Sequence, residues 1–514
     1  MAEIISSMKT FSQVKDARWY PRYHIAAPFG WCNDPNGMCF YKGQYHFFYQ
    51  HYPYEPRWGP MHWGHVVSDD LAYWKHLPIA LKPDQPYDEG GCFTGSAIEK
   101  DGRLYLMYTG HVPDRPQTQA LAVSEDGINF EKSTLNPILT VPQSDEIHGG
   151  DFRDPKVWFH DGKYYAVIGG RSRDEQEGFA LLFKSSDLVH WTFVNVSARA
   201  EGNEGKMWEC PNFAEIDGRD VLIFSPMILD TADGKFYRDK AAGVLIGKLD
   251  YVTGVFDRGE FQYLDKGFNF YAPQVTQTPD GRTIMIGWMA TWDVEMREAV
   301  DGWAGQMTIP RELHVRDGKI FSTPVKELEA LRKWKPVTCQ DVVFDEAATI
   351  DGVKGEAYEV VMTIDAAESK TFSIAFRASE KEQTVLRYDH ASGKFTFDRT
   401  NSGQLIRELD FTNEIGVKPA DFVREIEIGS VDKLKLHIFV DRSSLEVFIN
   451  DGAEVLSGRI YPKRTSQEIV FKPEAELLEI DSLEFYKLDF GIPHPHVKDE
   501  TTKDLQKEFP FLKK

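Results

Sequence analysis

Apolar and polar residues alternate in a pattern that repeats along the first two-thirds of the chain. An alternating segment, a tight turn containing glycine and a second alternating segment occur five times. The turn glycines lie 56 to 63 residues apart and are Gly43, Gly102, Gly162, Gly218 and Gly281. Lys-Gly or Asp-Gly between such segments predicts a β-hairpin, because glycine adopts the positive φ that tight turns require.

A second recurring segment follows the first three hairpins. It runs from a serine through a turn to an aromatic residue, at 68–74, 124–130 and 185–191. The combined unit predicts a four-stranded antiparallel sheet that cannot bury both faces alone. Five such sheets favour radial packing into a five-bladed β-propeller over residues 19–320. A five-layer solenoid is the competing interpretation, although solenoid repeats are usually shorter.

The pattern changes after the repeats. Residues 321–336 have apolar positions at helical spacing, with Thr323 as the cap and Pro324 in the first turn, and predict a short amphipathic linker helix. Residues 337–490 return to short alternating strands, which predicts a β-sandwich. Residues 491–514 are rich in proline and lysine and are interpreted as a tail. The expected fold class is therefore all-β, an N-terminal propeller followed by a sandwich.

Composition and charge restrict the class of protein. A chain of 514 residues exceeds one hydrophobic core and suits two domains. Its formal net charge of −21 repels phosphate backbones and anionic lipid, which argues against nucleic-acid or membrane-surface binding. No apolar stretch of 18 residues predicts a transmembrane helix, and the first residues show no signal-peptide pattern.

Cysteine usage indicates a reducing compartment. The chain has five cysteines, an odd number, and none of them shows CxxC spacing. Neither a disulfide framework nor a zinc site is therefore expected. We therefore expect a cytoplasmic protein. The cysteines are Cys32, Cys39, Cys92, Cys210 and Cys339.

Acidic residues occur near one phase of the repeat. Asp34, Asp154 and Glu209 each precede the turn glycine of their repeat by eight or nine residues, where the other repeats carry Thr94 and Ala272. The innermost strands of a propeller surround one axis, so we expect the three carboxylates to meet at one end of it. A single acid before a proline is more commonly a turn residue. Three at one phase favour a functional site.

Three carboxylates in one place predict glycosidic chemistry. Because like charges repel, at least one should keep its proton near neutral pH. A protonated acid beside an ionised carboxylate is the pair that cleaves glycosidic bonds. Aromatic residues in or near the same segments are interpreted as walls of a sugar site: Trp31, Trp58, Trp63, Phe93, Trp208, Trp288 and Trp303.

Four motifs, in order, resemble those of glycoside hydrolase family 32, the invertases, fructanases and sucrose-6-phosphate hydrolases. They are Gly-Trp-Cys-Asn-Asp-Pro-Asn-Gly at 30–37, Phe-Thr-Gly-Ser-Ala at 93–97, Phe-Arg-Asp-Pro-Lys at 152–156 and Trp-Glu-Cys-Pro at 208–211. Residues 441–450 are similar to the family's second domain. The resemblance spans about residues 19 to 490, and segments such as 58–65 look closest to bacterial intracellular members.

The resemblance implies a retaining β-fructofuranosidase that acts by double displacement. Asp34 is then the nucleophile, Glu209 the acid and base, and Asp154 the residue that holds fructose hydroxyls. A retaining pair should have its carboxyl groups about 5 to 5.5 Å apart. No metal or organic cofactor is implied. The substrate-binding residues expected are Trp31, Asn33, Gln50, Trp58, Phe93, Thr94 and Arg153.

The sequence departs from the family pattern at three positions. Cys32 stands where many members have Met, and Thr94 replaces a common Ser but keeps the hydroxyl. Asn269 stands where relatives often carry Asp, near the expected leaving-group side, so the identity of the leaving group stays open. The substrate is sucrose, sucrose 6-phosphate or a short fructan, because no residue can be assigned to a phosphate.

Other functions fit fewer residues. A non-catalytic sugar-binding propeller is expected to lack one of the three carboxylates, and a protein-interaction propeller has no reason to place acids at the channel mouth. Five-bladed glycosidases acting on arabinan or xylan lack the Asn-Asp-Pro-Asn-Gly opening. A zinc site at His62, His65 or His160 is weakly supported, because lone histidines near tryptophan are commonly structural. We expect a small carbohydrate as the bound molecule and a monomer or homodimer in solution.

Overall fold

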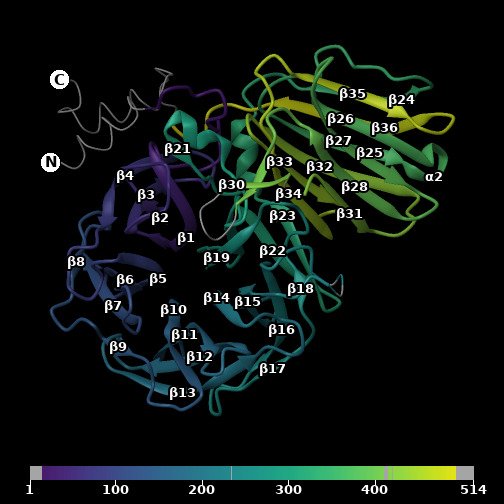
Figure 1. Ribbon diagram of the computed structural model, residues 1–514. Helices are drawn as coiled ribbons and strands as arrows, with labels where there is room; N and C mark the ends of the chain where they lie inside the picture. The colour runs from purple at the N-terminus through teal and green to yellow at the C-terminus, as the bar shows by residue number, and fades with distance from the viewer. Residues whose placement is uncertain (1–13, 233, 235, 410–414, 420, 494–514) are drawn as a thin grey trace, which may run out of the picture.

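The computed structural model describes residues 14–232, 234, 236–409, 415–419 and 421–493 (Figure 1). Strands dominate these residues, which confirms the all-β class. The helices they contain are short: η1 (Arg297–Asp301) and η2 (Lys326–Leu331), both 3-10, and α2 (Ala366–Ser369).

Residues 30–324 form five sheets, counted over the described chain. The first contains β1 (Gly30–Tyr41), β2 (Gln44–Tyr52), β3 (His62–Ser68), β4 (Trp74–Leu81) and β21 (Trp303–Ala304). The second contains β5 (Gly91–Lys100), β6 (Arg103–His111), β7 (Thr118–Ser124), β8 (Glu131–Lys132) and β9 (Leu139–Thr140). The third contains β10 (Ile147–His160), β11 (Lys163–Ser172), β12 (Gly178–Ser185) and β13 (Trp191–Arg199).

The remaining two sheets follow the same plan. The fourth contains β14 (Met207–Ile216), β15 (Arg219–Met227), β16 (Gly243–Leu249), β17 (Phe256–Arg258) and β18 (Gln262–Tyr263). The fifth contains β19 (Tyr271–Gln277), β20 (Thr283–Trp288), β22 (Arg311–Arg316) and β23 (Lys319–Pro324).

The five sheets stand around a common centre, each with its first strand innermost (Figure 1). The innermost strands β1, β5, β10, β14 and β19 contact their neighbours in that order, and β19 contacts β1. The ring is also closed by β21, which pairs in parallel with β1 through Trp303 and Gly30. A residue at the start of one inner strand therefore lies close to its counterparts in the other sheets.

The predicted hairpins join the first and second strands of all five sheets. All five turn glycines have positive φ, and in four turns the preceding residue does as well. Two successive residues with positive φ are the mark of a type I′ turn, whose twist matches that of the strands. The turn pairs with both φ positive are Lys42-Gly43, Asp101-Gly102, Asp161-Gly162 and Asp217-Gly218.

The second recurring segment joins the third and fourth strands of the first three sheets. In each copy an aspartate oxygen accepts the backbone N–H groups of the residues two and three positions later. The aspartates are Asp70, Asp126 and Asp187. Their side chains satisfy turn donors that would otherwise lack a protein partner, which explains why this segment recurs.

The predicted linker helix over 321–336 is wrong in type and extent. Ser322 to Pro324 belong to β23, where Arg311 pairs with Pro324 and the ladder fixes an extended backbone. Thr323 therefore caps no helix, and the cap position is held by Val325 without a side-chain hydrogen bond. The 3-10 helix η2 follows, with Leu328 buried, and the fifth sheet ends four residues beyond the expected boundary at 320.

Two further antiparallel sheets form the C-terminal part. One contains β24 (Val337–Phe344), β36 (Leu478–Lys487), β25 (Tyr358–Asp365), β32 (Lys433–Asp441), β33 (Ser444–Ile449) and β34 (Glu454–Arg459). The other contains β31 (Val423–Glu427), β28 (Lys394–Asn401), β27 (Gln383–Asp389), β26 (Thr371–Ala378) and β35 (Glu468–Pro473). Buried residues of both sheets share one hydrophobic core. A separate hairpin pairs β29 (Arg407–Leu409) with β30 (Ile415–Pro419).

A buried charged network joins the ring to the C-terminal sheets. The imidazole nitrogens of His24 lie 2.9 Å from carboxylate oxygens of Asp441 and Glu446. Arg311 donates to Glu446 and, at 2.9 Å, to Asp265. All five side chains are fully buried, so the two parts are held by ion pairs that water does not screen.

Gly491 returns the chain to the first sheet. Its N–H donates to the carbonyl of Arg22 and its carbonyl accepts from the N–H of Trp74, both at 2.7 Å. The remainder of the expected tail, 494–514, lies outside the described residues.

Candidate active site

Each innermost strand contains a β-bulge at the same point. There two residues of the inner strand face one residue of its hairpin partner, so pairing shifts register. A bulge bends a strand and redirects its side chains. The bulged pairs are Asn33-Asp34, Phe93-Thr94, Asp154-Pro155, Cys210-Pro211 and Ala272-Pro273.

The three predicted acids do not share one position of the bulge, which corrects the expected common phase. Asp154 is a first bulge residue with φ of 67°, and its counterparts are Cys210 and Ala272 at 48° and 49°. Asp34 is a second bulge residue, and Glu209 precedes its bulge. Counting eight or nine residues back from a turn concealed this difference, because a bulge changes the alignment by one residue.

Asp34 is buried and held by two neighbours. Its Oδ1 accepts from the amide of Asn33 at 2.9 Å, and its Oδ2 accepts from the hydroxyl of Thr94 at 2.8 Å. The indole of Trp31 donates to Asn33 Oδ1 at 2.7 Å, which fixes the orientation of that amide. The Cys210 thiol lies 3.7 Å from Asp34 Oδ2. The carboxylate is thus fixed in place before any substrate arrives.

Asp154 lies close to the same thiol. Its Oδ2 accepts from the backbone N–H of Cys210 at 2.9 Å and lies 3.5 Å from the sulfur. Its own N–H donates to the Thr109 hydroxyl at 3.0 Å, which secures the unusual backbone angle. The structure therefore brings Asp34 and Asp154 together around Cys210.

Glu209 is held by a cation and a phenol. Arg153 donates to its Oε1 from Nε at 3.0 Å and from Nη2 at 2.7 Å, and the Tyr271 hydroxyl donates to its Oε2 at 2.6 Å. Arg153 is shared with Asp151 at 2.6 Å, and Asp151 also pairs with Arg171. Arg153, Glu209 and Tyr271 each directly precede the bulge of their strand. The three hydrogen-bonded residues therefore come from the same structural position in three neighbouring sheets.

Burial and the charge of Glu209 raise the pKa of both aspartates. Burial raises the pKa of Asp34, the charge of Glu209 raises it further, and the bonds from Asn33 and Thr94 oppose the shift. Burial raises the pKa of Asp154 to about 7, with Arg153 opposing and the charges of Glu209 and Asp34 adding to the rise. This agrees with the expectation that one carboxylate of the group keeps its proton near neutrality.

The other predicted binding residues surround this group. Gln50 is buried opposite the β1 bulge and donates to the Cys92 carbonyl at 3.0 Å. Trp58 is 45% exposed and meets the edge of Phe93 at 6.2 Å between ring centroids. Phe93 in turn stacks on His111 at 4.2 Å. Trp58 and Phe93 thus form an aromatic edge next to Thr94.

Four of the seven aromatic residues interpreted as walls belong to the core instead. Their side chains have no exposed surface, and they pack within or between the sheets. Tryptophan is large and apolar, so its presence near a motif does not separate a binding wall from a packed core. The four are Trp63, Trp208, Trp288 and Trp303.

Asn269, expected near the leaving-group side, is held between the ring and the C-terminal sheets. Its side chain is buried, and its Oδ1 accepts from Arg399 Nη1 and from the backbone N–H of Arg459, both at 2.9 Å. Both partners belong to the C-terminal sheets. Asn269 therefore joins the ring to those sheets.

Sequence reasoning gave no role to Tyr271, Cys210, Asp151 or Trp292. Tyr271 and Cys210 adjoin the predicted strand starts, so aligning the repeats by their bulges would have found them. Asp151 lies two residues before Arg153 and carried no separate signal. Trp292 stacks on Trp31 at 5.9 Å but follows β20 in a loop that no repeat marks.

Comparison with protein families decides the relationship. The Glycosyl hydrolases family 32 N-terminal domain matches residues 24–324, and the C-terminal domain of the same family matches residues 327–487. The chain belongs to glycosyl hydrolase family 32. The resemblance read from the four motifs is confirmed, and the protein is a glycoside hydrolase.

Family 32 relatives cover most of the chain. A sucrose-6-phosphate hydrolase of Zymomonas mobilis is 36% identical over 480 residues, 89% of this chain and 90% of the relative. A raffinose invertase of Escherichia coli is 37% identical over 90% of this chain and 94% of its own. A β-fructofuranosidase of Bombyx mori, also solved in complex with sucrose, superimposes with a TM-score of 0.81 at 34% identity, covering 96% of this chain and 99% of its own.

Two further properties concern this family 32 chain. Within the described ranges, no three or more His, Cys, Asp and Glu side chains are arranged to hold a metal ion. A helix of the length and apolar character needed to span a bilayer is also missing from those ranges.

Proposed function

We propose that this chain is a retaining β-fructofuranosidase that hydrolyses the fructosyl bond of sucrose or sucrose 6-phosphate. The observation that carries the proposal is the group of three carboxylates at Cys210, of which Asp34 and Asp154 are buried and Glu209 is bonded to Arg153 and Tyr271. The relatives support it, since they include a sucrose-6-phosphate hydrolase, a raffinose invertase and a β-fructofuranosidase solved in complex with sucrose.

The proposal includes the finer architecture. The five sheets around one centre are blades of a five-bladed β-propeller, and the two C-terminal sheets form a β-sandwich. Domain limits of 19–320 for the propeller, 321–336 for the linker and 337–490 for the sandwich, with 491–514 as a tail, are proposed with the fifth blade extended to Pro324. The bulges then open toward one end of the central axis, where a small sugar enters.

In the first step Asp34 attacks the anomeric carbon of the fructosyl unit. A new bond forms between a carboxylate oxygen and that carbon, and the bond to the leaving oxygen breaks. Asn33 and Thr94 hold both carboxylate oxygens, so the nucleophile is oriented without loss of entropy at the moment of attack. The leaving oxygen takes a proton from Glu209.

In the second step Glu209 takes a proton from water, and the oxygen of that water displaces Asp34. Glu209 accepts hydrogen bonds from Arg153 at 2.7 Å and from Tyr271 at 2.6 Å. The bonds from Arg153 and Tyr271 keep its carboxyl group in one orientation through both steps.

Asp154 binds the fructosyl unit. A buried carboxyl whose pKa is raised to about 7 both donates and accepts hydrogen bonds near neutral pH, which suits sugar hydroxyls. Trp31, Gln50, Trp58 and Phe93 are proposed to line the same subsite, as the family resemblance implies. The distance of about 5 to 5.5 Å between the reacting carboxyl groups of Asp34 and Glu209 remains a prediction.

Two measurements test the function. The initial anomer of released fructose, followed by NMR, should keep the β configuration, and release of the α anomer would overturn the retaining mechanism. Comparison of kcat/KM for sucrose, sucrose 6-phosphate and 1-kestose decides between the substrates. A preference for 1-kestose would identify a short-fructan hydrolase instead.

The location and assembly are proposed as well. All five cysteines are free thiols, which supports a cytoplasmic protein. A monomer or homodimer is proposed, and sedimentation of the purified protein tests it.

A further inference from the structure

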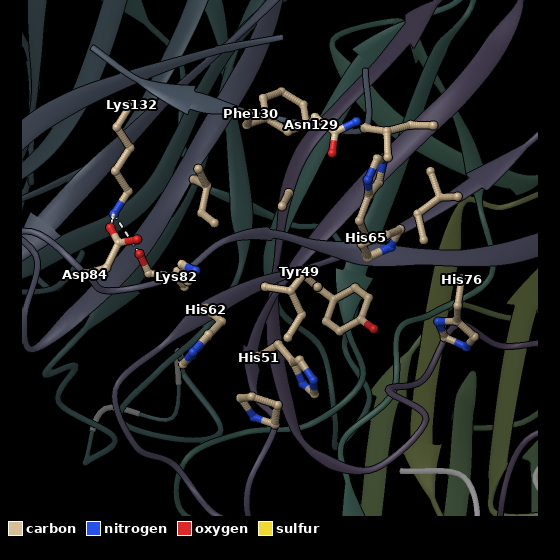
Figure 2. A pocket seen from close by; sticks show the side chains of 18 of the residues that line it. Tyr49, His51, His62, His65, His76, Lys82, Asp84, Asn129, Phe130 and Lys132 are labelled. Carbon is tan, nitrogen blue, oxygen red and sulfur yellow. Dashed lines mark hydrogen bonds and ion pairs between the residues drawn. The ribbon is translucent and has the colours of Figure 1, made fainter. Parts of the chain in front are cut away.

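A cavity lies between the first two sheets, apart from the carboxylates. This inter-sheet groove has a volume of about 670 Å³, and its walls come from β2, β3, β4 and residues 128–132 (Figure 2). None of the residues assigned to the fructosyl site lines it. Its size suits a small carbohydrate.

Neutral imidazoles dominate one wall of the groove. Burial lowers the pKa of His51 and of His62 to about 4, and that of His76 to about 3. Burial also places the pKa of His65 well below its ordinary value. These four rings line the groove as uncharged groups at neutral pH.

The hydrogen bonds of two rings fix which nitrogen accepts. His51 Nδ1 lies 2.8 Å from the Trp31 carbonyl and His62 Nδ1 lies 3.0 Å from the Pro60 carbonyl. A carbonyl oxygen only accepts, so each Nδ1 carries the hydrogen and each Nε2 keeps a lone pair. Both rings therefore offer an acceptor, which is what a sugar hydroxyl needs as its partner.

His65 adds an unsatisfied polar atom to the same wall. Its side chain is buried, its Nε2 lies 3.0 Å from His46 Nδ1, and its Nδ1 has no hydrogen-bond partner among the described residues. Buried polar nitrogen atoms are nearly always paired, but this one has almost no accessible surface, so the acceptors that the groove offers are those of His51 and His62.

One of the two lysines that line the groove, Lys132, is already neutralised. The Lys132 ammonium group donates to Asp84 at 2.8 Å and to Asp88 at 2.6 Å, as Figure 2 shows for Asp84. It also donates to the Lys82 carbonyl at 2.6 Å. Anions such as phosphate bind to unpaired cations and to donors. A wall of acceptors beside a paired lysine favours a neutral polyhydroxyl compound.

Tyr54 provides an aromatic surface at the groove. Its side chain is 65% exposed, and its ring is supported by edge contacts with Tyr52 at 5.4 Å and His62 at 5.7 Å. Exposed aromatic rings stack on the apolar faces of sugars. Tyr54 and Trp58 both belong to the loop between β2 and β3, so the groove and the fructosyl site share that loop.

We propose that the inter-sheet groove is a second, non-catalytic site that binds a neutral di- or oligosaccharide. Tyr54 stacks on a sugar ring, and the Nε2 atoms of His51 and His62 accept hydrogen bonds from sugar hydroxyls. The site does not depend on the roles of the three carboxylates.

Titration calorimetry with sucrose tests the site in the Asp34→Ala variant, with glucose release recorded in parallel. Two binding sites are expected per chain. Adding Tyr54→Ala should leave one site, whereas adding Phe159→Ala, which truncates a 57% exposed aromatic elsewhere, should leave two. A single site in Asp34→Ala, or two sites after Tyr54→Ala, overturns the proposal. Continued glucose release would instead contradict the assignment of Asp34.

His62→Asn provides a finer test in the same background. Asn keeps a donor for the Pro60 carbonyl but lacks the Nε2 acceptor, so sucrose binding at the groove should weaken about tenfold. Unchanged affinity counts against the acceptor role. Inorganic phosphate at equal concentration should not displace the second sucrose, and displacement would overturn the assignment to a neutral ligand.

Discussion

Both carboxylate oxygens of Glu209 accept hydrogen bonds, so replacing this residue removes one proton donor that is held in a fixed orientation. We expect Glu209→Ala to lower kcat on sucrose by about 10²- to 10⁴-fold, and to affect far less a fructoside whose leaving group needs no proton. Initial rates on both substrates measure this. Glu215→Ala, an exposed acid on the same strand, should leave both rates unchanged. Equal losses on the two substrates would contradict the acid role.

Asp34 is expected to carry the covalent intermediate. Asp34→Ala should abolish trapping of a fructosyl group on the protein, because it removes the carboxylate that forms the ester. Mass spectrometry of quenched reactions detects the adduct. Thr94→Ser keeps the hydroxyl that bonds Asp34 and should keep the trapped species. A fructosyl adduct in Asp34→Ala would remove the assignment.

The raised pKa of Asp154 predicts a pH-dependent stability change. In the unfolded chain this group loses its proton near the ordinary aspartate value, while in the folded protein it holds the proton to about pH 7. The free energy of unfolding therefore falls as the pH rises from the unfolded pKa to the folded pKa of Asp154. Above the folded pKa the loss is complete. Asp154→Asn cannot ionise, so its advantage over the parent should grow from pH 4 to pH 8.

The expected gain reaches roughly 4 kcal/mol at most, because three pKa units correspond to about that much. Thermal unfolding of both proteins across this pH range measures it. Asn retains an oxygen for the Cys210 N–H, so the backbone contact survives. A Tm difference that stays constant with pH would contradict the shifted pKa.

Single residues also show where sequence reading of the site succeeds and fails. Asp34, Asp154 and Glu209 could be predicted to lie near one another because each adjoins a repeated strand start and a motif; their catalytic roles remain predictions. Tyr271 was not assigned a role, since its bond to Glu209 depends on a bulge that the sequence does not mark. Trp208 was misassigned, because a tryptophan has the same apolar character in a core as in a wall.

Among the elements, hairpins were more predictable than bulges. A tight turn requires positive φ at neighbouring residues, so it can be recognised from a local pair such as Asp161-Gly162. A bulge depends on which partner residues pair across the sheet, which is not local. The linker prediction failed for the same reason, since pairing of Ser322 with Leu313 in β22 outweighs a modest helical pattern.

The aspartate turns between the third and fourth strands should stabilise their sheets. Asp126→Ala removes the acceptor for two backbone N–H groups and should lower the free energy of unfolding by about 1 kcal/mol. Urea denaturation measures the loss. Asp126→Asn keeps an acceptor oxygen and should lose less. Equal stability of the Ala variant and the parent would show that solvent satisfies these donors.

At the scale of the whole molecule, His24 connects the ring to the C-terminal sheets. Burial lowers its pKa, but the bonds and charges of Asp441 and Glu446 outweigh burial and raise it overall. A histidine with a raised folded pKa contributes fully below its unfolded pKa and loses that contribution as pH rises through the folded one. Arg311, the other charged group bonded to Glu446, does not titrate in this range.

His24→Gln should therefore lower the free energy of unfolding by roughly 3 to 5 kcal/mol at pH 6, because it removes the positive charge that the buried carboxylates of Asp441 and Glu446 share. The cost should shrink at alkaline pH. Denaturant unfolding at several pH values tests this. His190→Gln, at an exposed His-Asp pair, should change stability little at any pH. A cost at His24 that does not vary with pH would contradict the charged pairing.

The contacts of Trp303 with Gly30 and of Gly491 with Trp74 have a consequence for biosynthesis. The first sheet emerges from the ribosome early, but the residues that pair with its two edge strands are synthesised hundreds of residues later. At a translation rate of about 5 to 20 residues per second, Trp74 waits roughly 20 to 80 seconds for Gly491. The part of the enzyme that carries Asp34 is begun first and completed last.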